Sequence, residues 1–510
     1  MRVAVPHLRG GVTCRVVVKI NTRQSSGLGL IYLRRICRLA VGAAGAVAGV
    51  AVLGAPSALK AETLNEALAA AYQYNPQLDA ERARLRATDE EVTRARSGFR
   101  PVITGNADIN YDWQKNRTST TTTEDTLKPG GYSVNAVQPL FSGFRTINAV
   151  NEQEANVRAG REVLRSVEQN VLLQAVTAFM DVVRDQAIVR LRENNVNVLT
   201  RELRATEDRF AVGEVTRTDV AQAQARRAGA VSNLDLAKAN LKTSRAAYER
   251  VVGHAPQNLI EPKGYERFLP RSLEEAVNVG THENPAVVNA LYLEQASKFA
   301  VDRIRGELLP SVQLEASYSD RFETTQSINE SEGVTVTGRL TVPIYEGGEV
   351  YARVRQQKHI HVSRLQEIEQ ARSESEEQVV AAWSQLLAAR AQIQSDQSQV
   401  EANTTALTGV REEERVGQRT LLDVLNAEVE LLNSQVQLVS TRRNLVVASY
   451  AVLAAVGRLD SVNLGFTSVS YDPEANYQEV RRKPWGTSIT HSDGRIEEVP
   501  AESDYSGSAK

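Results

Sequence analysis

The stretch PLFSG at residues 139–143 returns as PIYEG at residues 343–347, an offset of 204 residues. A second pair of motifs has the same offset and the pattern glycine, two residues, threonine, two residues, aspartate, at residues 213–219 and 417–423. Nearer the amino terminus an Asn-Pro pair is repeated at an offset of 209: Asn75-Pro76 and Asn284-Pro285. An ordered series of matches across both halves of the chain indicates an internal duplication.

These matches divide the 510 residues into five predicted parts. A leader is followed by the first repeat, a proline-containing linker, the second repeat and a polar, aperiodic tail that we predict to be disordered. In that order the parts cover residues 1–61, 62–255, 256–271, 272–470 and 471–510.

The leader carries nine basic and no acidic residues, and its apolar stretch at residues 39–53 precedes small residues that end at Ala61. This order is typical of a cleaved secretory signal peptide, with a retained anchor as the alternative. Cys14 and Cys37, the two cysteines of the sequence, both lie in the leader. We therefore expect a mature chain without disulfides, thiol chemistry or a lipid-anchoring cysteine. Its 51 basic and 62 acidic residues do not favour nucleic acid as a partner.

Each half contains two stretches in which apolar and polar residues alternate, as in half-buried strands. The predicted strands span about ten residues each, a length that suits a tilted membrane strand. Aromatic residues lie near their ends, and the segments that join them are polar. A small antiparallel sheet packed on a helix is the alternative. The four strands are predicted at residues 102–113, 132–141, 311–320 and 333–344.

Four strands cannot close a membrane barrel, and a lipid bilayer does not tolerate an open sheet edge. The chain must therefore oligomerise if its strands enter a membrane. Two copies would supply eight strands and three copies twelve, and the residues alone leave this choice open.

Long helices are predicted next to these strands. Residues 349–408 contain neither Gly nor Pro, and residues 144–212 contain only Gly160. A helix of about 60–70 residues is on the order of 90–105 Å long. In the last helix, a heptad-like seam runs from Leu425 to Tyr450 and is interrupted by Arg443, which predicts packing against other helices.

The sequence contains no phosphate-binding glycine loop, no nucleophile elbow and no zinc-protease motif. His359 and His361 are two residues apart, on nearly opposite sides of a helix, which disfavours a shared metal. We predict no enzyme activity, no cofactor and no metal. The rival classes are a coiled-coil stalk or adhesin, which would not need the duplicated strand pairs, and a periplasmic adaptor, which would carry one helical hairpin.

The residues from about 62 to 470 resemble the TolC family of outer-membrane efflux and type I secretion channels. Two ordered copies of the motifs at residues 138–143, 342–348, 213–220 and 417–424 carry this resemblance. It implies a mostly α protomer with a membrane β part, which assembles as a homotrimer. The trimer would form a 12-stranded β-barrel and an α-helical barrel tunnel that spans into the periplasm of a Gram-negative bacterium.

The resemblance also implies a function. The trimer would passively conduct drugs, small toxic molecules or secreted proteins to the outside of the cell. Its partners would be outer-membrane lipid, a periplasmic membrane-fusion adaptor and an inner-membrane transporter of the ABC or RND type.

Four prolines are predicted to mark the junctions between helix and barrel strand: Pro101, Pro139, Pro310 and Pro343. At the tips of the helical hairpins, adaptor contacts are expected at four positions: Gly213, Thr216, Gly417 and Thr420. A local alternative for the tips is helix capping, in which each threonine starts a helix and bonds the aspartate three residues on.

By resemblance, Asp423 would face the periplasmic constriction, where a ring of carboxylates favours cations. Asn426 stands where relatives often carry a second aspartate, so the ring should carry less charge. Arg419 would latch the inner hairpin to the neighbouring outer one through Thr218 and Asp219. Glu414 stands where relatives carry tyrosine, which leaves part of this latch open.

Overall fold

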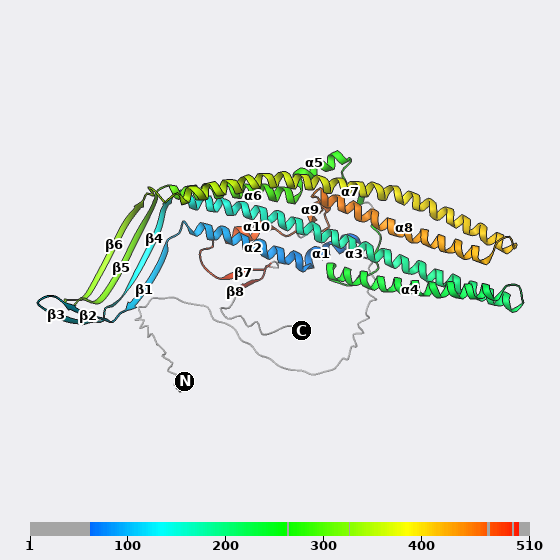
Figure 1. Cartoon of the computed structure of the whole chain (residues 1–510), viewed down its shortest axis with the longest axis horizontal. Helices are drawn as coiled ribbons and strands as arrows, with labels where there is room; N and C mark the ends of the chain where they lie inside the picture. The colour runs from blue at the N-terminus through cyan, green and yellow to red at the C-terminus, as the bar shows by residue number, and fades with distance from the viewer. Residues whose placement is uncertain (1–61, 263–264, 326, 467–469, 492–493, 499–510) are drawn as a thin grey trace, which may run out of the picture. The chain divides into compact units, whose positions relative to one another are not determined.

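The computed structural model describes residues 62–498, apart from 263–264, 326, 467–469 and 492–493. The predicted leader and residues 499–510 lie outside the described residues. Figure 1 shows the order of the elements along the chain, in which strands lead into two long helical hairpins.

The two halves have matching helices in the same order. The first half contains α1 (Leu64–Tyr74), α2 (Pro76–Ser97), α3 (Arg145–Ala211) and α4 (Arg217–Val252). The second half contains α5 (Leu273–Glu283), α6 (Pro285–Arg305), α7 (Glu349–Arg415) and α8 (Leu421–Ala455). Short elements follow or intervene: η1 (Tyr265–Phe268), η2 (Gly306–Leu308) and α9 (Ser461–Leu464).

The repeated Asn-Pro pair has the same role in both halves. Asn75 caps α2 and donates a hydrogen bond from Nδ2 to the carbonyl of Val251 (3.0 Å). Asn284 caps α6 and donates to the carbonyl of Ala455 (2.9 Å). The proline in the first turn of each helix lacks only an N–H that would have no partner within the helix. Each pair thereby ties a short helix to the end of the hairpin of its own half.

The strands that precede the hairpins form one antiparallel sheet in the order β1-β4-β5-β6. Its two halves meet where β4 pairs with β5, so β1 and β6 form the edges. A separate hairpin, β2 with β3, lies between β1 and β4 in the chain. The strand bounds are β1 (Val102–Ile109), β2 (Asp112–Arg117), β3 (Thr122–Leu127), β4 (Gly130–Ser142), β5 (Ser311–Thr325) and β6 (Ile328–Thr341).

The first predicted strand was too long, because β1 ends at Ile109. The next backbone N–H, that of Asn110, donates to the carbonyl of Pro129 (2.7 Å), and the chain then enters the β2–β3 hairpin. The polar segment predicted as a loop therefore contains this hairpin. In the second half, β5 and β6 likewise extend into the predicted loop as far as Thr325 and Ile328.

Three of the four prolines lie at strand ends and one does not. Pro101 and Pro310 directly precede β1 and β5, and Pro343 follows the end of β6. Pro139 lies inside β4, so its predicted position at a junction is wrong. The register of β4 against β5 shifts between Pro139 and Phe141. A strand accepts proline at such an irregularity because proline has no N–H for the ladder.

The transition from strand to helix requires an unusual backbone conformation in both halves. Gly143 and Phe144 have φ values of 61° and 61°, and Gly347 and Gly348, at the equivalent positions, have 66° and 84°. A Cβ on Gly143 would lie 2.3 Å from the carbonyl oxygen of Gly306, so this site also requires glycine for space.

The long helices form two hairpins, α3 with α4 and α7 with α8, and α3 also packs against α8. Both α3 and α7 have 67 residues, as the absence of Pro and the near absence of Gly in these stretches predicted. The main apolar core includes Leu68, Phe179, Tyr248 and Leu453, which come from α1, α3, α4 and α8. No helix in the described residues is long and apolar enough to cross a membrane.

Arg443 interrupts the apolar seam of α8 because it bonds to the other hairpin. Its Nε donates to Oδ1 of Asp181 on α3 at 2.9 Å. The polar residue in the seam is thus an ion-pair partner between hairpins, and such pairs can fix the register of packed helices.

The predicted disorder of the tail is wrong for the described residues up to 498. This segment forms α10 (Pro473–Val480) and a small hairpin of β7 (Ser488–Thr490) with β8 (Ile496–Glu498). Tyr477 of α10 is buried beside Val92 and Val157 of α2 and α3. Two aromatic residues of this segment, Tyr471 and Tyr477, are the sequence signal for this packing.

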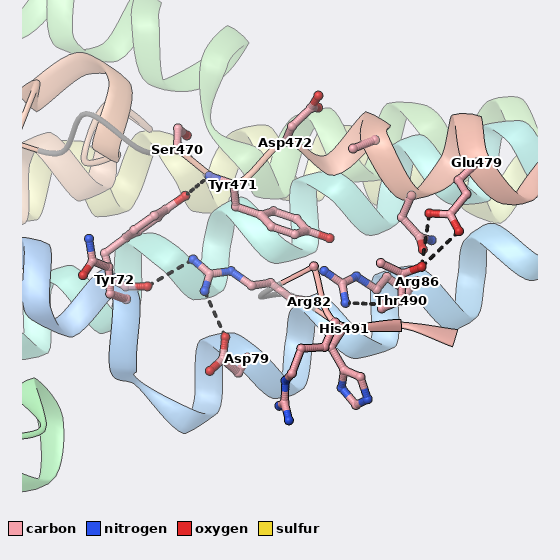
Figure 2. A pocket seen from close by; sticks show the side chains of 15 residues that line it. Tyr72, Asp79, Arg82, Arg86, Ser470, Tyr471, Asp472, Glu479, Thr490 and His491 are labelled. Carbon is pink, nitrogen blue, oxygen red and sulfur yellow. Dashed lines mark hydrogen bonds and ion pairs between the residues drawn. The ribbon is translucent and has the colours of Figure 1, made fainter. Parts of the chain in front are cut away.

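Beside α10, residues of α1, of α2 and of the tail line an open pocket, shown in Figure 2. The guanidinium of Arg82 lies between two aromatic rings, 4.8 Å from the centre of Tyr72 and 5.2 Å from that of Tyr471. The Tyr72 hydroxyl accepts the backbone N–H of Tyr471 (2.9 Å), and Arg86 donates to the carbonyl of Thr490 (2.8 Å). These contacts hold the tail against α1 and α2.

Candidate gate at the hairpin tips

The tip between α3 and α4 is built by local capping. Gly213 has φ 82° and Thr216 is the N-cap of α4. Oδ2 of Asp219 accepts the backbone N–H of Thr216 (2.9 Å) and its hydroxyl (2.7 Å). These hydrogen bonds, from the side chain and then the backbone of Thr216, lower the pKa of Asp219. The arrangement is a capping box, and it keeps the aspartate ionised at neutral pH.

The tip between α7 and α8 repeats this design. Gly417 has φ 77° and Thr420 is the N-cap of α8. Oδ2 of Asp423 accepts the backbone N–H of Thr420 (3.0 Å) and its hydroxyl (2.8 Å), and both bonds lower the pKa of Asp423. Glycine is suited to each turn because a left-handed conformation has no Cβ penalty there. The local alternative, helix capping, is therefore present at both tips.

Arg419 does not bond to Thr218 or Asp219 within the described protomer. Its Nε pairs with Oε2 of Glu413 at 3.0 Å, on its own hairpin. The turn explains this pairing, because the N–H of Gln418 donates to the carbonyl of Glu413 and brings Arg419 close to the last turn of α7. The predicted latch between the hairpins is thus not formed by these residues inside one chain.

Other residues connect the two hairpins near the tips. Arg209 of α3 pairs with Glu414 of α7 at 2.8 Å. Arg226 of α4 donates to Oδ1 of Asn426 of α8, also at 2.8 Å. Glu414 and Asn426, the two positions at which the resemblance implied a departure from the family pattern, both contribute to the connection.

An apolar layer lies next to these polar links. Leu199, Ala230 and Leu425 come from α3, α4 and α8 and are buried together. Beyond it, Glu428 is 5% exposed and accepts a hydrogen bond from Arg411. Burial, followed by the charges of Glu428 and Glu414, raises the pKa of Glu202 on α3. The site therefore contains an ion pair and a hydrogen bond that join the two hairpins, and capping boxes that fix the turns at their tips.

Two segments, residues 67–254 and 281–458, match the family described as outer membrane efflux protein. The chain belongs to this family, whose members are channel proteins of the outer membrane and not enzymes.

Among its relatives is the outer membrane efflux protein BepC of Brucella suis biovar 1, which is 38% identical over 90% of this chain and 99% of that protein. The outer membrane protein TolC of Vibrio cholerae is 25% identical over 79% of this chain and 92% of its own length. The crystal structure of the Campylobacter jejuni CmeC outer membrane channel has a TM-score of 0.70 at 16% identity, covering 82% of this chain and 89% of that one. This likeness confirms the TolC-like fold.

Proposed function

We propose that three copies of this chain form an outer-membrane channel that passively conducts exported molecules out of a Gram-negative cell. The observation that carries the proposal is the sheet β1-β4-β5-β6, which has two unpaired edges and two chemically different faces. Edge pairing of β6 with β1 of the next copy would close three sheets into a 12-stranded barrel and leave no edge in the bilayer.

The register of the sheet separates its two faces. One face has apolar cross-strand rows, such as Ile103, Ala136, Ala316 and Val336. Val336 is 66% exposed in the protomer. Large apolar side chains that remain exposed on a sheet favour contact with lipid.

The opposite face has polar rows, such as Thr104, Asn135, Ser317 and Thr335. It also contains the ion pair between Arg339 and Glu315 at 2.7 Å. This face suits a water-filled lumen.

We propose that the helical hairpins continue this lumen as a tunnel into the periplasm. Asp423 and Asn426 would lie at its constriction, with Asp423 as the charged ring. The exposed tip turns around Gly213, Thr216, Gly417 and Thr420 would contact a periplasmic adaptor. An inner-membrane transporter of the ABC or RND type would supply the energy, since the hairpins contain no catalytic constellation that could do so.

The test combines assembly with conductance. The purified protein should run as a heat-modifiable trimer and conduct ions in planar bilayers. A set of double variants should each carry one cysteine at Thr104 of β1 and one at a position between residues 333 and 339 of β6. If β6 of one copy pairs with β1 of the next, the variant whose two cysteines face each other should form disulfides between copies. A soluble, non-conducting filament without such disulfides would instead favour the coiled-coil stalk.

The exported cargo is tested in the native host. Deletion should raise sensitivity to drugs and small toxic molecules, or remove particular proteins from the culture medium. Restoring the chain with Gly417 and Thr420 replaced by bulky residues should fail to restore export if these tips contact the adaptor, even though trimer and conductance persist.

A further inference from the structure

A buried carboxylate lies between the hairpins, two turns into α8. Glu428 accepts a hydrogen bond from Arg411 through Oε1. Its other oxygen, Oε2, is buried and has no hydrogen-bond partner in the part of the chain that the structure describes. An unpaired polar atom in a region of low dielectric costs free energy, so a donor at this position would stabilise the contact.

Glu202 of α3 is the carboxylate on the opposite hairpin. The charged groups that face it are Glu428 of α8, Glu414 and Arg411 of α7, and Arg209 of its own helix. The fourth packed helix, α4, contributes two arginines that bond elsewhere: Arg226 to Asn426 and Arg227 to Thr200. Glu202 therefore has two other carboxylates beside it, those of Glu428 and Glu414, and the two arginines that face it pair with these carboxylates: Arg411 with Glu428 and Arg209 with Glu414.

We propose that Glu202 and Glu428 form a proton-operated contact between the two hairpins, closed when Glu202 is protonated and loosened when it ionises. A protonated Glu202 is a hydrogen-bond donor, and Oε2 of Glu428 is a buried acceptor without a partner. An ionised Glu202 adds a second carboxylate charge beside the first, which repels it in a poorly hydrated place.

The direction of the pH effect follows from linkage. Glu202 binds its proton more tightly in the packed arrangement than it would with the hairpins apart and the carboxylates hydrated. Acid therefore favours the packed, closed arrangement, and a rise in pH above the ordinary glutamate range favours separation. Each pKa unit of difference between the two arrangements changes their ratio about tenfold.

The inference rests on the proposed channel function and is tested by single-channel conductance of the full trimer between about pH 4.5 and about pH 8. The wild-type chain should open increasingly as the pH rises. Glu202→Gln should remove most of this dependence and keep the low-pH, closed behaviour. Glu207→Gln is the matched control, because Glu207 is exposed on the same helix and should leave the wild-type profile unchanged.

A second readout does not depend on conductance. Spin labels on cysteines at Val212 and Val416, exposed residues of the two tips, report the distance between hairpins. Labelled and unlabelled copies are mixed so that most trimers carry one labelled copy and the distance is measured within that copy. This distance should increase with pH in the wild-type background and remain short in Glu202→Gln.

The outcomes separate the two proposals. A wild-type trimer that does not conduct at any pH contradicts the channel function. A conducting trimer whose opening and tip distance ignore pH, or in which Glu202→Gln titrates like the wild type, contradicts the proton-operated contact alone.

Discussion

At the residue scale, Asp89 shows how burial sets the charge of a single group. It is 1% exposed on α2, and Asn476 of α10 donates a hydrogen bond to it at 2.7 Å. Burial raises its pKa from 3.8 to about 6, more than this hydrogen bond and Arg161 lower it. The hydrogen bond that joins the tail to α2 therefore involves a carboxyl group whose charge changes near pH 6.

The sign of the resulting pH dependence is fixed by the raised pKa. The folded state favours the neutral acid, so Asp89 contributes most stability below its ordinary pKa of 3.8, and this is lost as the pH rises through about 6. Asp89→Asn should remove this loss and stabilise the attached tail at neutral pH by about 1–3 kcal/mol. Limited proteolysis of the tail across this pH range measures the effect. Glu90→Gln, one residue away and exposed, removes only one of the smaller charges that raise this pKa and should reproduce little of the effect.

Asp423 and Asp219 offer a matched pair, because both complete the same capping box. Replacing either with alanine removes an equivalent cap, so any effect of the cap should be common to both variants. If Asp423 also forms the constriction ring, Asp423→Ala should weaken the block of single channels by multivalent cations, whereas Asp219→Ala should not. Equal block in the two variants would remove Asp423 from the constriction.

At the element scale, the hairpins are connected by an ion pair that the motifs did not predict. Arg209→Ala breaks the pair with Glu414 and leaves the hairpins less tightly joined, so the conductance of the closed channel should rise. The exchanged variant Arg209→Glu with Glu414→Arg should restore it, since the pair is reformed with opposite polarity.

Arg419→Ala is the comparison for this prediction. Arg419 pairs with Glu413 on its own hairpin, an exposed pair of small expected contribution. Its removal should change closed-state conductance less than removal of Arg209. A larger effect from Arg419 would instead indicate that it bonds a neighbouring copy in the trimer.

At the scale of the whole molecule, the assembly predicts which face of the sheet contacts water. Thr335 and Val336 are adjacent in β6 and lie in a polar and an apolar cross-strand row, respectively. In intact outer membranes, a cysteine at Thr335 should react with a small water-soluble thiol reagent through the lumen. A cysteine at Val336 should remain protected by lipid. Equal reactivity would contradict a lipid-facing apolar row.

Patterns with a fixed local spacing could be predicted from the sequence. Thr216 and Asp219, like Thr420 and Asp423, are three residues apart, and a capping box requires that separation. The strands followed from their two-residue period, and the long helices from the absence of Pro and the scarcity of Gly. The duplication was visible because its motifs recur in order.

Contacts between distant parts of the chain could not be predicted in this way. Arg209 and Glu414 are 205 residues apart, and their meeting depends on how the two hairpins align. The tail was predicted to be disordered because its composition is polar, but Tyr471 bonds to Tyr72 of α1 and Asn476 bonds to Asp89 of α2.

The strands, the long hairpins and their capped tips could be predicted from local spacing, because they depend on interactions within a few residues, and the duplication could be predicted from motifs that recur in order. The bulge at Pro139, the attachment of the tail and the partners that join the hairpins depend on the tertiary structure. Each of these requires two surfaces to meet in one register, and a buried charge such as Glu428 depends on every helix that surrounds it.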